Sequence, residues 1–122
     1  MKEEELFSND RRLFPRFKIA LPLKCVDLNL NNEFKTHTYD ISADGLGIVI
    51  NQHLSAGTIL QICIIMPDTY EEILRKGRVI WSKRIDSDYR IGIKLESPGL
   101  NATSLVLRTV DYRIKSCLKQ TS

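Results

Sequence analysis

Tyr89-Arg90-Ile91-Gly92-Ile93-Lys94-Leu95 is the stretch that decides the fold, because an apolar side chain stands at every second position along it. Successive side chains of a β-strand point to opposite faces, so the tyrosine and the three aliphatic residues would share one face. The pattern predicts a strand with one side in an apolar core and the other side toward solvent.

Five further stretches upstream have the composition of strands, and most of them are separated by short polar turns. Apolar residues recur at every second position from Phe17 to Cys25, and the run from Thr58 to Met66 is strongly apolar. Gly77 lies inside the fifth stretch and marks a candidate β-bulge. The expected strands cover residues 17–25, 34–41, 45–50, 58–66, 73–83 and 89–95.

The pattern changes after Ser97-Pro98-Gly99, where the apolar period becomes that of a helix. Apolar residues at i, i+3, i+7 and i+10 form one stripe, and Asn101 has the side chain of an N-cap residue. We expect a helix over about residues 100–119, with the stripe packed over one barrel opening or one sheet edge. The stripe consists of Leu107, Val110, Ile114 and Cys117.

Six short strands joined mostly by tight turns indicate an all-β antiparallel barrel or sandwich, here with a C-terminal α-helix. A length of 122 residues fits one domain. Residues 1–10 are acidic and lack sustained periodicity, so we assign them to a flexible N-terminal segment and residues 11–122 to a single domain.

Composition argues against several classes of protein. A net charge of +3 gives no general reason to expect a polyanion partner. The three cysteines are odd in number and contain no C-x-x-C pair, so we expect neither a disulfide framework nor a zinc ribbon, and a reducing, cytoplasmic environment. No run approaches the ~20 apolar residues of a membrane span. Because no metal-ligand set and no nucleophile with a base is recognisable, we expect neither an enzyme nor a bound cofactor or metal ion.

Two short motifs carry the chemistry of a candidate binding site. Arg11-Arg12-Leu13-Phe14-Pro15-Arg16 contains R-x-x-x-R, and Asp40-Ile41-Ser42-Ala43-Asp44-Gly45 contains D-x-S-x-x-G. Guanidinium groups match phosphate oxygens and the O6/N7 edge of guanine, and a carboxylate can accept hydrogen bonds from guanine N1 and N2. Taken singly, the first motif is more simply a solvated basic run, and the second is more simply a turn in which Asp and Ser bind nearby backbone.

Together, in this order and with strand-like sequence between and after them, the two motifs resemble the paired signature of the PilZ domain. That family binds the bacterial second messenger cyclic di-GMP. Gly77-Arg78-Val79-Ile80-Trp81 and the stretch 89–95 are similar to the family's later strands, although Leu95 stands where the family often has phenylalanine. The resemblance covers about residues 11–95 and implies a six-stranded antiparallel β-barrel of the split-barrel type, often followed by a helix.

The resemblance also implies which residues bind the ligand. Gly45 suits either a positive φ or a close approach of ligand to the backbone, whereas Asp44, at a variable position of the motif, is expected to be solvated. Trp81 either packs at the core or rim or stacks on a guanine, and Lys83 either adds positive charge near the site or belongs to a solvated face. The implied ligand-binding residues are Arg11, Arg12, Arg16, Asp40, Ser42 and Gly45, with Trp81 and Lys83 as secondary candidates.

The implied function is that of a cytoplasmic receptor. Cyclic di-GMP would bind between the two motifs and order the arginine loop, whose three like charges have no evident partner in the free protein. The new surface would then be presented to an unidentified protein partner. No DNA or RNA partner and no membrane insertion are expected. In the family, an arginine directly before R-x-x-x-R, here Arg11, is associated with an intercalated ligand pair, which implies two ligands per chain.

Two alternatives to this function remain open. The first is an adaptor of the same family that does not bind nucleotide and acts only through protein contacts. The second is a β-barrel that binds single-stranded nucleic acid through a basic groove with interleaved aromatic residues.

Overall fold

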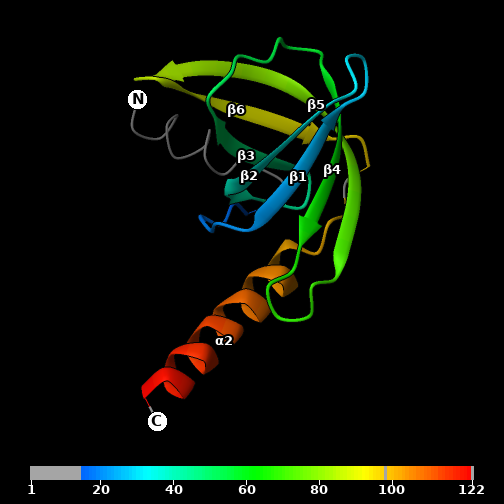
Figure 1. The fold of residues 1–122 in the computed structure, drawn as a ribbon. Coiled ribbons are helices and arrows are strands. Elements are labelled where there is room, and N and C mark those ends of the chain that lie inside the picture. The colour runs from blue at the N-terminus through cyan, green and yellow to red at the C-terminus, as the bar shows by residue number, and fades with distance from the viewer. Residues whose placement is uncertain (1–14, 98, 122) are drawn as a thin grey trace, which may run out of the picture.

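The computed structural model describes residues 15–97 and 99–121 and consists of a β-barrel followed by one helix (Figure 1). All strand pairs are antiparallel, and the order β1-β2-β3-β6-β5-β4 closes because β4 pairs with β1. This confirms the predicted six-stranded barrel with a C-terminal helix. The strands are β1 (Pro22–Asp27), β2 (Asn32–Ile41), β3 (Gly45–Ile50), β4 (Ile59–Ile65), β5 (Glu72–Ile85) and β6 (Asp88–Leu95).

The barrel interior is a packed apolar core, as expected for a small barrel whose lumen is filled by side chains. The alternation predicted for β6 is confirmed, because Ile91, Ile93 and Leu95 are buried while Lys94 is exposed. Cys25 is also buried in this core, and burial raises the pKa of its thiol to about 12. Cys25 therefore behaves as a small hydrophobe rather than a reactive thiol.

The segment before β1 departs from the prediction of one continuous strand over residues 17–25. Phe17 forms only an isolated bridge with Ile41, and β1 begins at Pro22. Between these points the buried Thr38 on β2 holds the segment through both its backbone and its side chain. Its hydroxyl accepts a hydrogen bond from the Leu21 amide (2.8 Å) and donates one to the Ile19 carbonyl, and its own amide donates to the Leu21 carbonyl at 2.9 Å. The residues from Phe17 to Leu21 thus run along β2, held at one end by the Phe17–Ile41 bridge and at the other by Thr38.

The predicted bulge at Gly77 is wrong. Gly77 pairs regularly with Leu95, and the register of β5 against β6 shifts two residues later, between Val79 and Trp81. Gly77 has a packing role instead, because a Cβ at this position would lie 2.6 Å from Ile93 Cγ2, inside the barrel core. The absence of a side chain gives the neighbouring isoleucines their space.

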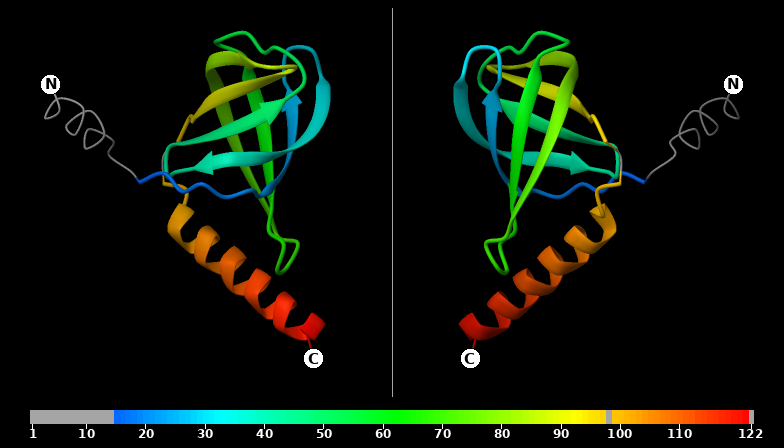
Figure 2. Two further views of the ribbon diagram at one scale, coloured as in Figure 1. Left: turned by 90° about the vertical axis from the view of Figure 1, so that its left-hand side faces the viewer. Right: turned by 90° about the vertical axis from the view of Figure 1, so that its right-hand side faces the viewer.

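The helix α2 (Ala102–Thr121) leaves one end of the barrel and diverges from it, so that its C-terminal end lies away from the strands (Figure 2). Asn101 caps it as predicted, since its Oδ1 accepts a hydrogen bond from the Ser104 amide at 3.2 Å. Arg108 fastens it to the β4–β5 turn through hydrogen bonds to Asp68 at 2.9 and 3.0 Å and to Glu71 at 3.2 Å. Arg113, further along the helix, donates a second tie, a hydrogen bond of 2.6 Å from its Nη2 to the Ala20 carbonyl before β1.

The predicted packing of the apolar stripe onto the barrel is wrong. Leu107 is 64% exposed and Ile114 is 55% exposed, and Val110 and Cys117 are exposed as well. The residues that pack on the barrel lie on another face and close to the N-cap: Ala102, Leu105 and Val106, with Thr109 buried beside them. The apolar side chains that pack on the barrel belong to the first turns of the helix. The predicted apolar stripe lies further along the helix, where it is exposed.

Candidate functional site

The centre of the candidate site is a row of four outward-facing residues that crosses four neighbouring strands. Asp40 on β2 pairs with Gly47 on β3, Gly47 pairs with Gly92 on β6, and Gly92 pairs with Trp81 on β5. The row faces outward because the residues on either side of both glycines point into the core. A carboxylate and an indole that are 41 positions apart in sequence, at 40 and 81, are thus brought onto one surface.

The two glycines let these side chains lie flat against the barrel. A Cβ at Gly47 would lie 2.5 Å from Asp40 Oδ1, and a Cβ at Gly92 would overlap the Trp81 ring. The carboxylate therefore covers Gly47, and the indole covers Gly92. Since Gly47 and Gly92 are direct cross-strand partners, the carboxylate and the ring occupy adjacent positions, about one strand spacing of 4.8 Å apart.

Asp40 forms an ion pair with Arg16, the last arginine of R-x-x-x-R. Arg16 Nη1 lies 3.4 Å from both carboxylate oxygens, and the side chains of Arg16 and Asp40 are 33% and 14% exposed. The structure thus brings the two motifs together through one residue from each. The expectation that the arginine loop lacks a partner in the free protein is wrong for Arg16.

Arg16 reaches Asp40 because the chain beside it is fixed to β2. Phe17 exchanges both backbone hydrogen bonds with Ile41, each at 2.9 Å, and Thr38 holds the following residues. Phe17 itself is half-buried against the core. The backbone directly after Arg16 is therefore fixed, while the arginine side chain lies on the surface.

The D-x-S-x-x-G turn corrects two expectations. Ser42 is 1% exposed, and its hydroxyl donates to Asp44 Oδ1 at 2.8 Å and to the Gly45 carbonyl at 3.3 Å. Asp44 is thus a partner within the turn rather than merely solvated. Gly45 has no positive φ; it is needed because a Cβ would lie 2.7 Å from the Ile93 carbonyl oxygen on β6. In the free protein both motif residues shape the turn that follows Asp40.

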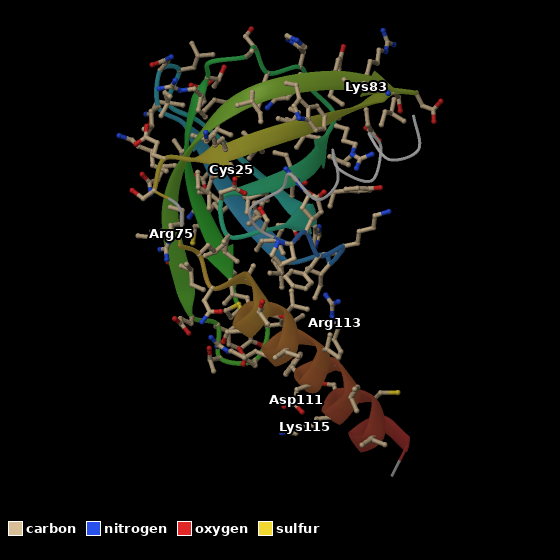
Figure 3. All side chains as sticks on the ribbon, turned by 180° about the vertical axis from the view of Figure 1, so that it is seen from behind. Cys25, Arg75, Lys83, Asp111, Arg113 and Lys115 are labelled. Atoms are coloured by element: carbon tan, nitrogen blue, oxygen red, sulfur yellow. The ribbon has the colours of Figure 1, made fainter. Side chains whose placement is uncertain are left out.

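The secondary candidates lie on the same outer surface. Trp81 is 42% exposed and one face of its ring lies on Gly92. It is therefore a surface residue and does not belong to the core. Lys83 is exposed near the end of β5, as the cross-strand partner of Arg90. Figure 3 shows Lys83 far from Arg75, which lies toward the other end of the same strand.

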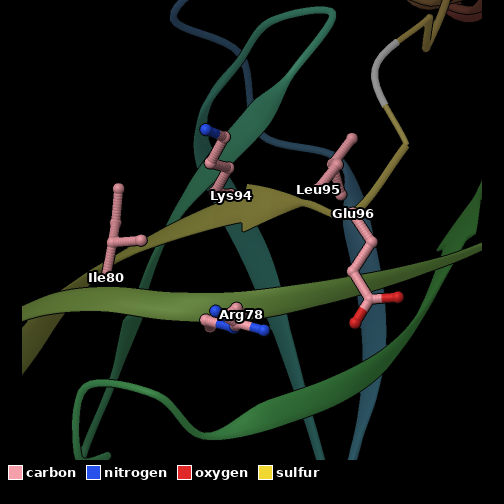
Figure 4. Close-up of a pocket in the computed structure, with 5 residues that line it drawn as sticks. All are labelled: Arg78, Ile80, Lys94, Leu95 and Glu96. Atoms are coloured by element: carbon pink, nitrogen blue, oxygen red, sulfur yellow. The ribbon is translucent and has the colours of Figure 1, made fainter.

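A surface depression of about 490 Å³ lies over β5 and β6. The close-up in Figure 4 shows Arg78 on β5 and Lys94 on the neighbouring β6, with Glu96 just after the end of β6. Lys94 pairs across the strands with both Gly45 and Arg78, so this depression adjoins the D-x-S-x-x-G turn. Its two cations add positive charge beside Asp40 and Trp81.

Several residues of this site were not singled out from the sequence. Gly47 and Gly92 gave no signal, because their partners become visible only once the strand register is known. Lys94 fits the alternating polar positions of its strand, and Arg78 lies within a stretch that is similar to a later strand of the family, so neither stands out as a site residue. Arg11 and Arg12 lie outside the described residues, so their predicted roles remain predictions.

Within residues 15–97 and 99–121, no three His, Cys, Asp or Glu side chains are grouped as metal ligands would be. In the same part of the chain, no helix has the length and hydropathy required to cross a membrane.

Comparison with known proteins identifies the fold. A family model described as the PilZ domain matches residues 10–111, which is most of the chain. A comparison with curated protein sequences finds no match.

Solved structures share the architecture at low sequence identity. The inhibitor of motility MotI/DgrA of Bacillus subtilis has 19% identity and a TM-score of 0.64, covering 86% of this chain and 52% of that one. The PilZ domain of Escherichia coli YcgR with c-di-GMP has 16% identity and a TM-score of 0.62, covering 91% and 97%. The K. pneumonia MrkH–c-di-GMP complex has 18% identity and a TM-score of 0.60, covering 90% and 55%. The chain thus spans about half the length of MotI/DgrA and MrkH, and these likenesses show a common fold.

Proposed function

We propose that this chain, which belongs to the PilZ domain family, is a receptor for cyclic di-GMP. The ligand would bind on the outer surface formed by β2, β3, β6 and β5. The observation that carries the proposal is the meeting of the two motifs at the Arg16–Asp40 ion pair, next to the Trp81 indole. The structures of YcgR and MrkH named above contain c-di-GMP, which supports the same ligand class here.

The chemistry of the surface suits a ligand with two guanines and two phosphates. The exposed face of Trp81 can stack on a purine, and Asp40, one strand spacing away, can accept hydrogen bonds from the N1 and N2 donors of that guanine. Arg16, together with Arg12 of the same motif and Arg11 directly before it, would bind phosphate oxygens or stack on the second base. Ser42 would contribute by holding the turn, since a direct contact requires its hydroxyl to leave Asp44.

Ligand binding would exchange one set of partners for another. Arg16 and Asp40 neutralise each other in the free protein. A surface ion pair with a separation of this size contributes only about 0–1 kcal/mol, so its replacement costs little. A phosphate of the ligand would bind Arg16 in place of Asp40, and the edge of a guanine would bind Asp40 in place of Arg16. These new contacts would draw residues 11–16 over the ligand. The altered surface would then be recognised by a protein partner.

The proposal includes a cytoplasmic location and no chemical reaction on the ligand. One titration separates it from both alternatives: the purified chain is mixed with cyclic di-GMP, with GTP and with a single-stranded oligonucleotide, and heat of binding is recorded. We expect saturable binding of cyclic di-GMP in preference to GTP and the oligonucleotide. Binding of none would favour the adaptor, and preference for the oligonucleotide would favour the nucleic-acid-binding barrel.

A further inference from the structure

Arg90 belongs to neither motif, yet its side chain lies beside the candidate site. Its guanidinium carbon lies 3.6 Å from the centre of the Tyr39 ring, so the two groups are stacked. Lys18 Nζ lies 6.0 Å from the centre of the same ring. One tyrosine therefore holds two cations, an arrangement whose mutual repulsion is relieved when an anion lies between or beside them.

The location of this cluster follows from local backbone structure. The register of β2 against β3 shifts between Thr38 and Asp40, which leaves Tyr39 at the irregularity and directly before Asp40. Lys18 follows Arg16 by two residues in the segment that runs along β2. The cluster of Lys18, Tyr39 and Arg90 is thus continuous with the Arg16–Asp40 pair.

The stack leaves the hydrogen-bonding edge of Arg90 free. Stacking uses the flat face of a guanidinium, whereas its N–H donors point outward in the plane. In the described part of the chain the Arg90 side chain forms no hydrogen bond, and its Nε is buried without a partner, so its two terminal nitrogens are the donors that a ligand would reach. Its cross-strand neighbour on β5 is another cation, Lys83, and neither forms an ion pair with a described carboxylate. The positive charge here is uncompensated within residues 15–97 and 99–121.

Arg90 also has the correct spacing from the central row. It precedes Gly92 by two residues on β6, so both face outward at a separation of about 6.6 Å. Gly92 lies under the Trp81 ring. A phosphodiester attached to a nucleoside stacked on that ring is a small anion of suitable chemistry for a planar donor held at this distance.

We propose that Arg90, held on Tyr39 and assisted by Lys18, binds one phosphodiester group of the dinucleotide. This inference rests on the proposed function and adds an anion-binding residue that the R-x-x-x-R and D-x-S-x-x-G motifs do not contain. Tyr39 acts as a positioning residue, because it orients the guanidinium and does not itself need to contact ligand.

The test compares two arginines on different parts of the barrel surface. Arg90→Gln and Arg75→Gln remove the same charge, and the Arg75 side chain is bonded only to the Leu74 carbonyl among described residues. Affinity for cyclic di-GMP is measured by calorimetry for both variants and for wild type, and thermal unfolding confirms that each is folded. We expect Arg90→Gln to weaken binding about 10- to 100-fold and Arg75→Gln to leave it within about threefold.

A second readout separates contact from general charge. In protein with ¹⁵N-labelled arginine, the Nε–H signal of Arg90 should shift on addition of cyclic di-GMP, whereas that of Arg75 should not. Tyr39→Phe keeps the ring face and should retain wild-type affinity, while Tyr39→Leu should weaken binding several-fold.

The possible failures are distinguishable. If wild type binds cyclic di-GMP and Arg90→Gln binds within threefold of it, the Arg90 subsite is wrong and the proposed function stands. Equal losses in Arg90→Gln and Arg75→Gln would also overturn the subsite, because only long-range charge would then be involved. If wild type binds no cyclic di-GMP, the proposed function fails and the subsite fails with it.

Discussion

Arg16 and Asp40, 24 positions apart in the chain, form an ion pair in which one guanidinium nitrogen lies 3.4 Å from both carboxylate oxygens. The pair joins the two motifs on the outer face of the barrel. Because a surface ion pair contributes only about 0–1 kcal/mol, little free energy is lost when ligand groups replace it. In the free protein, Arg16, the proposed phosphate-binding cation, and Asp40, the proposed acceptor for guanine, are therefore paired with each other.

Asp40 tests base recognition separately from charge. Asp40→Ala removes the acceptor for guanine N1 and N2, so affinity for cyclic di-GMP should fall about 10- to 100-fold. Affinity for cyclic di-AMP, whose adenines lack those donors, should change little, and the preference between the two should shrink in calorimetric titrations. A variant that binds both ligands more tightly would show instead that the carboxylate repels phosphate.

Thr38 tests whether the segment after Arg16 must be fixed. Thr38→Val keeps the shape but leaves the buried Leu21 amide without its acceptor, so the free energy of unfolding should fall by about 1–3 kcal/mol. Cyclic di-GMP affinity should also fall several-fold, because the backbone beside Arg16 loosens. Thr36→Val, which removes a more exposed bond to the Val49 carbonyl, is the control and should change stability by less than about 0.5 kcal/mol. Equal effects in urea unfolding would refute this role of Thr38.

Two leucines of α2 test where the helix is anchored. Leu105 is 5% exposed and Leu107 is 64% exposed, although both lie in the same two turns. Leu105→Ala should lower the free energy of unfolding by about 2–5 kcal/mol, whereas Leu107→Ala should change it by about 0.5 kcal/mol or less. Chemical denaturation of the two variants measures this difference. A larger loss for Leu107→Ala would mean that the stripe is buried in solution.

The Arg108–Asp68 contact predicts a dependence of stability on pH. Hydrogen bonding to Arg108 lowers the pKa of Asp68 below its ordinary value of 3.8. The contact therefore stabilises the fold fully above about pH 4, and the contribution is lost as pH falls through the lowered pKa. The stability difference between wild type and Arg108→Gln should be constant near neutrality and should shrink in urea titrations below pH 4. A difference that stays the same down to pH 2 would contradict it, and Arg75→Gln is the control.

The alternation in 89–95 predicted β6 correctly because strand period is a local property, whereas the alternation from Phe17 to Cys25 did not show that β1 begins only at Pro22. The relations that form the site are not local. Gly47 and Gly92 matter because β3 pairs with β6 in one register, and Tyr39 reaches Arg90 across β3 because β2 has an irregularity after Thr38. Neither register nor irregularity can be read from periodicity.

The wrong predictions have a similar cause. Periodicity identified the apolar stripe of α2 but could not say which part of the helix contacts the barrel, because the long-range bonds of Arg108 to Asp68 and Glu71 and of Arg113 to Ala20 leave no periodic pattern. Glycine is common at β-bulges, which made Gly77 the candidate. Here the missing side chain instead leaves space for core residues, and the register shifts near Ile80.

The central claim, that the Arg16–Asp40 surface binds cyclic di-GMP, is tested most directly by calorimetric titration of Arg16→Ala beside wild type. Arg16 is a surface residue, so the variant should fold, which thermal unfolding verifies. We predict saturable binding by wild type and a loss of at least about 10- to 100-fold in the variant. Wild-type affinity in Arg16→Ala would contradict the account.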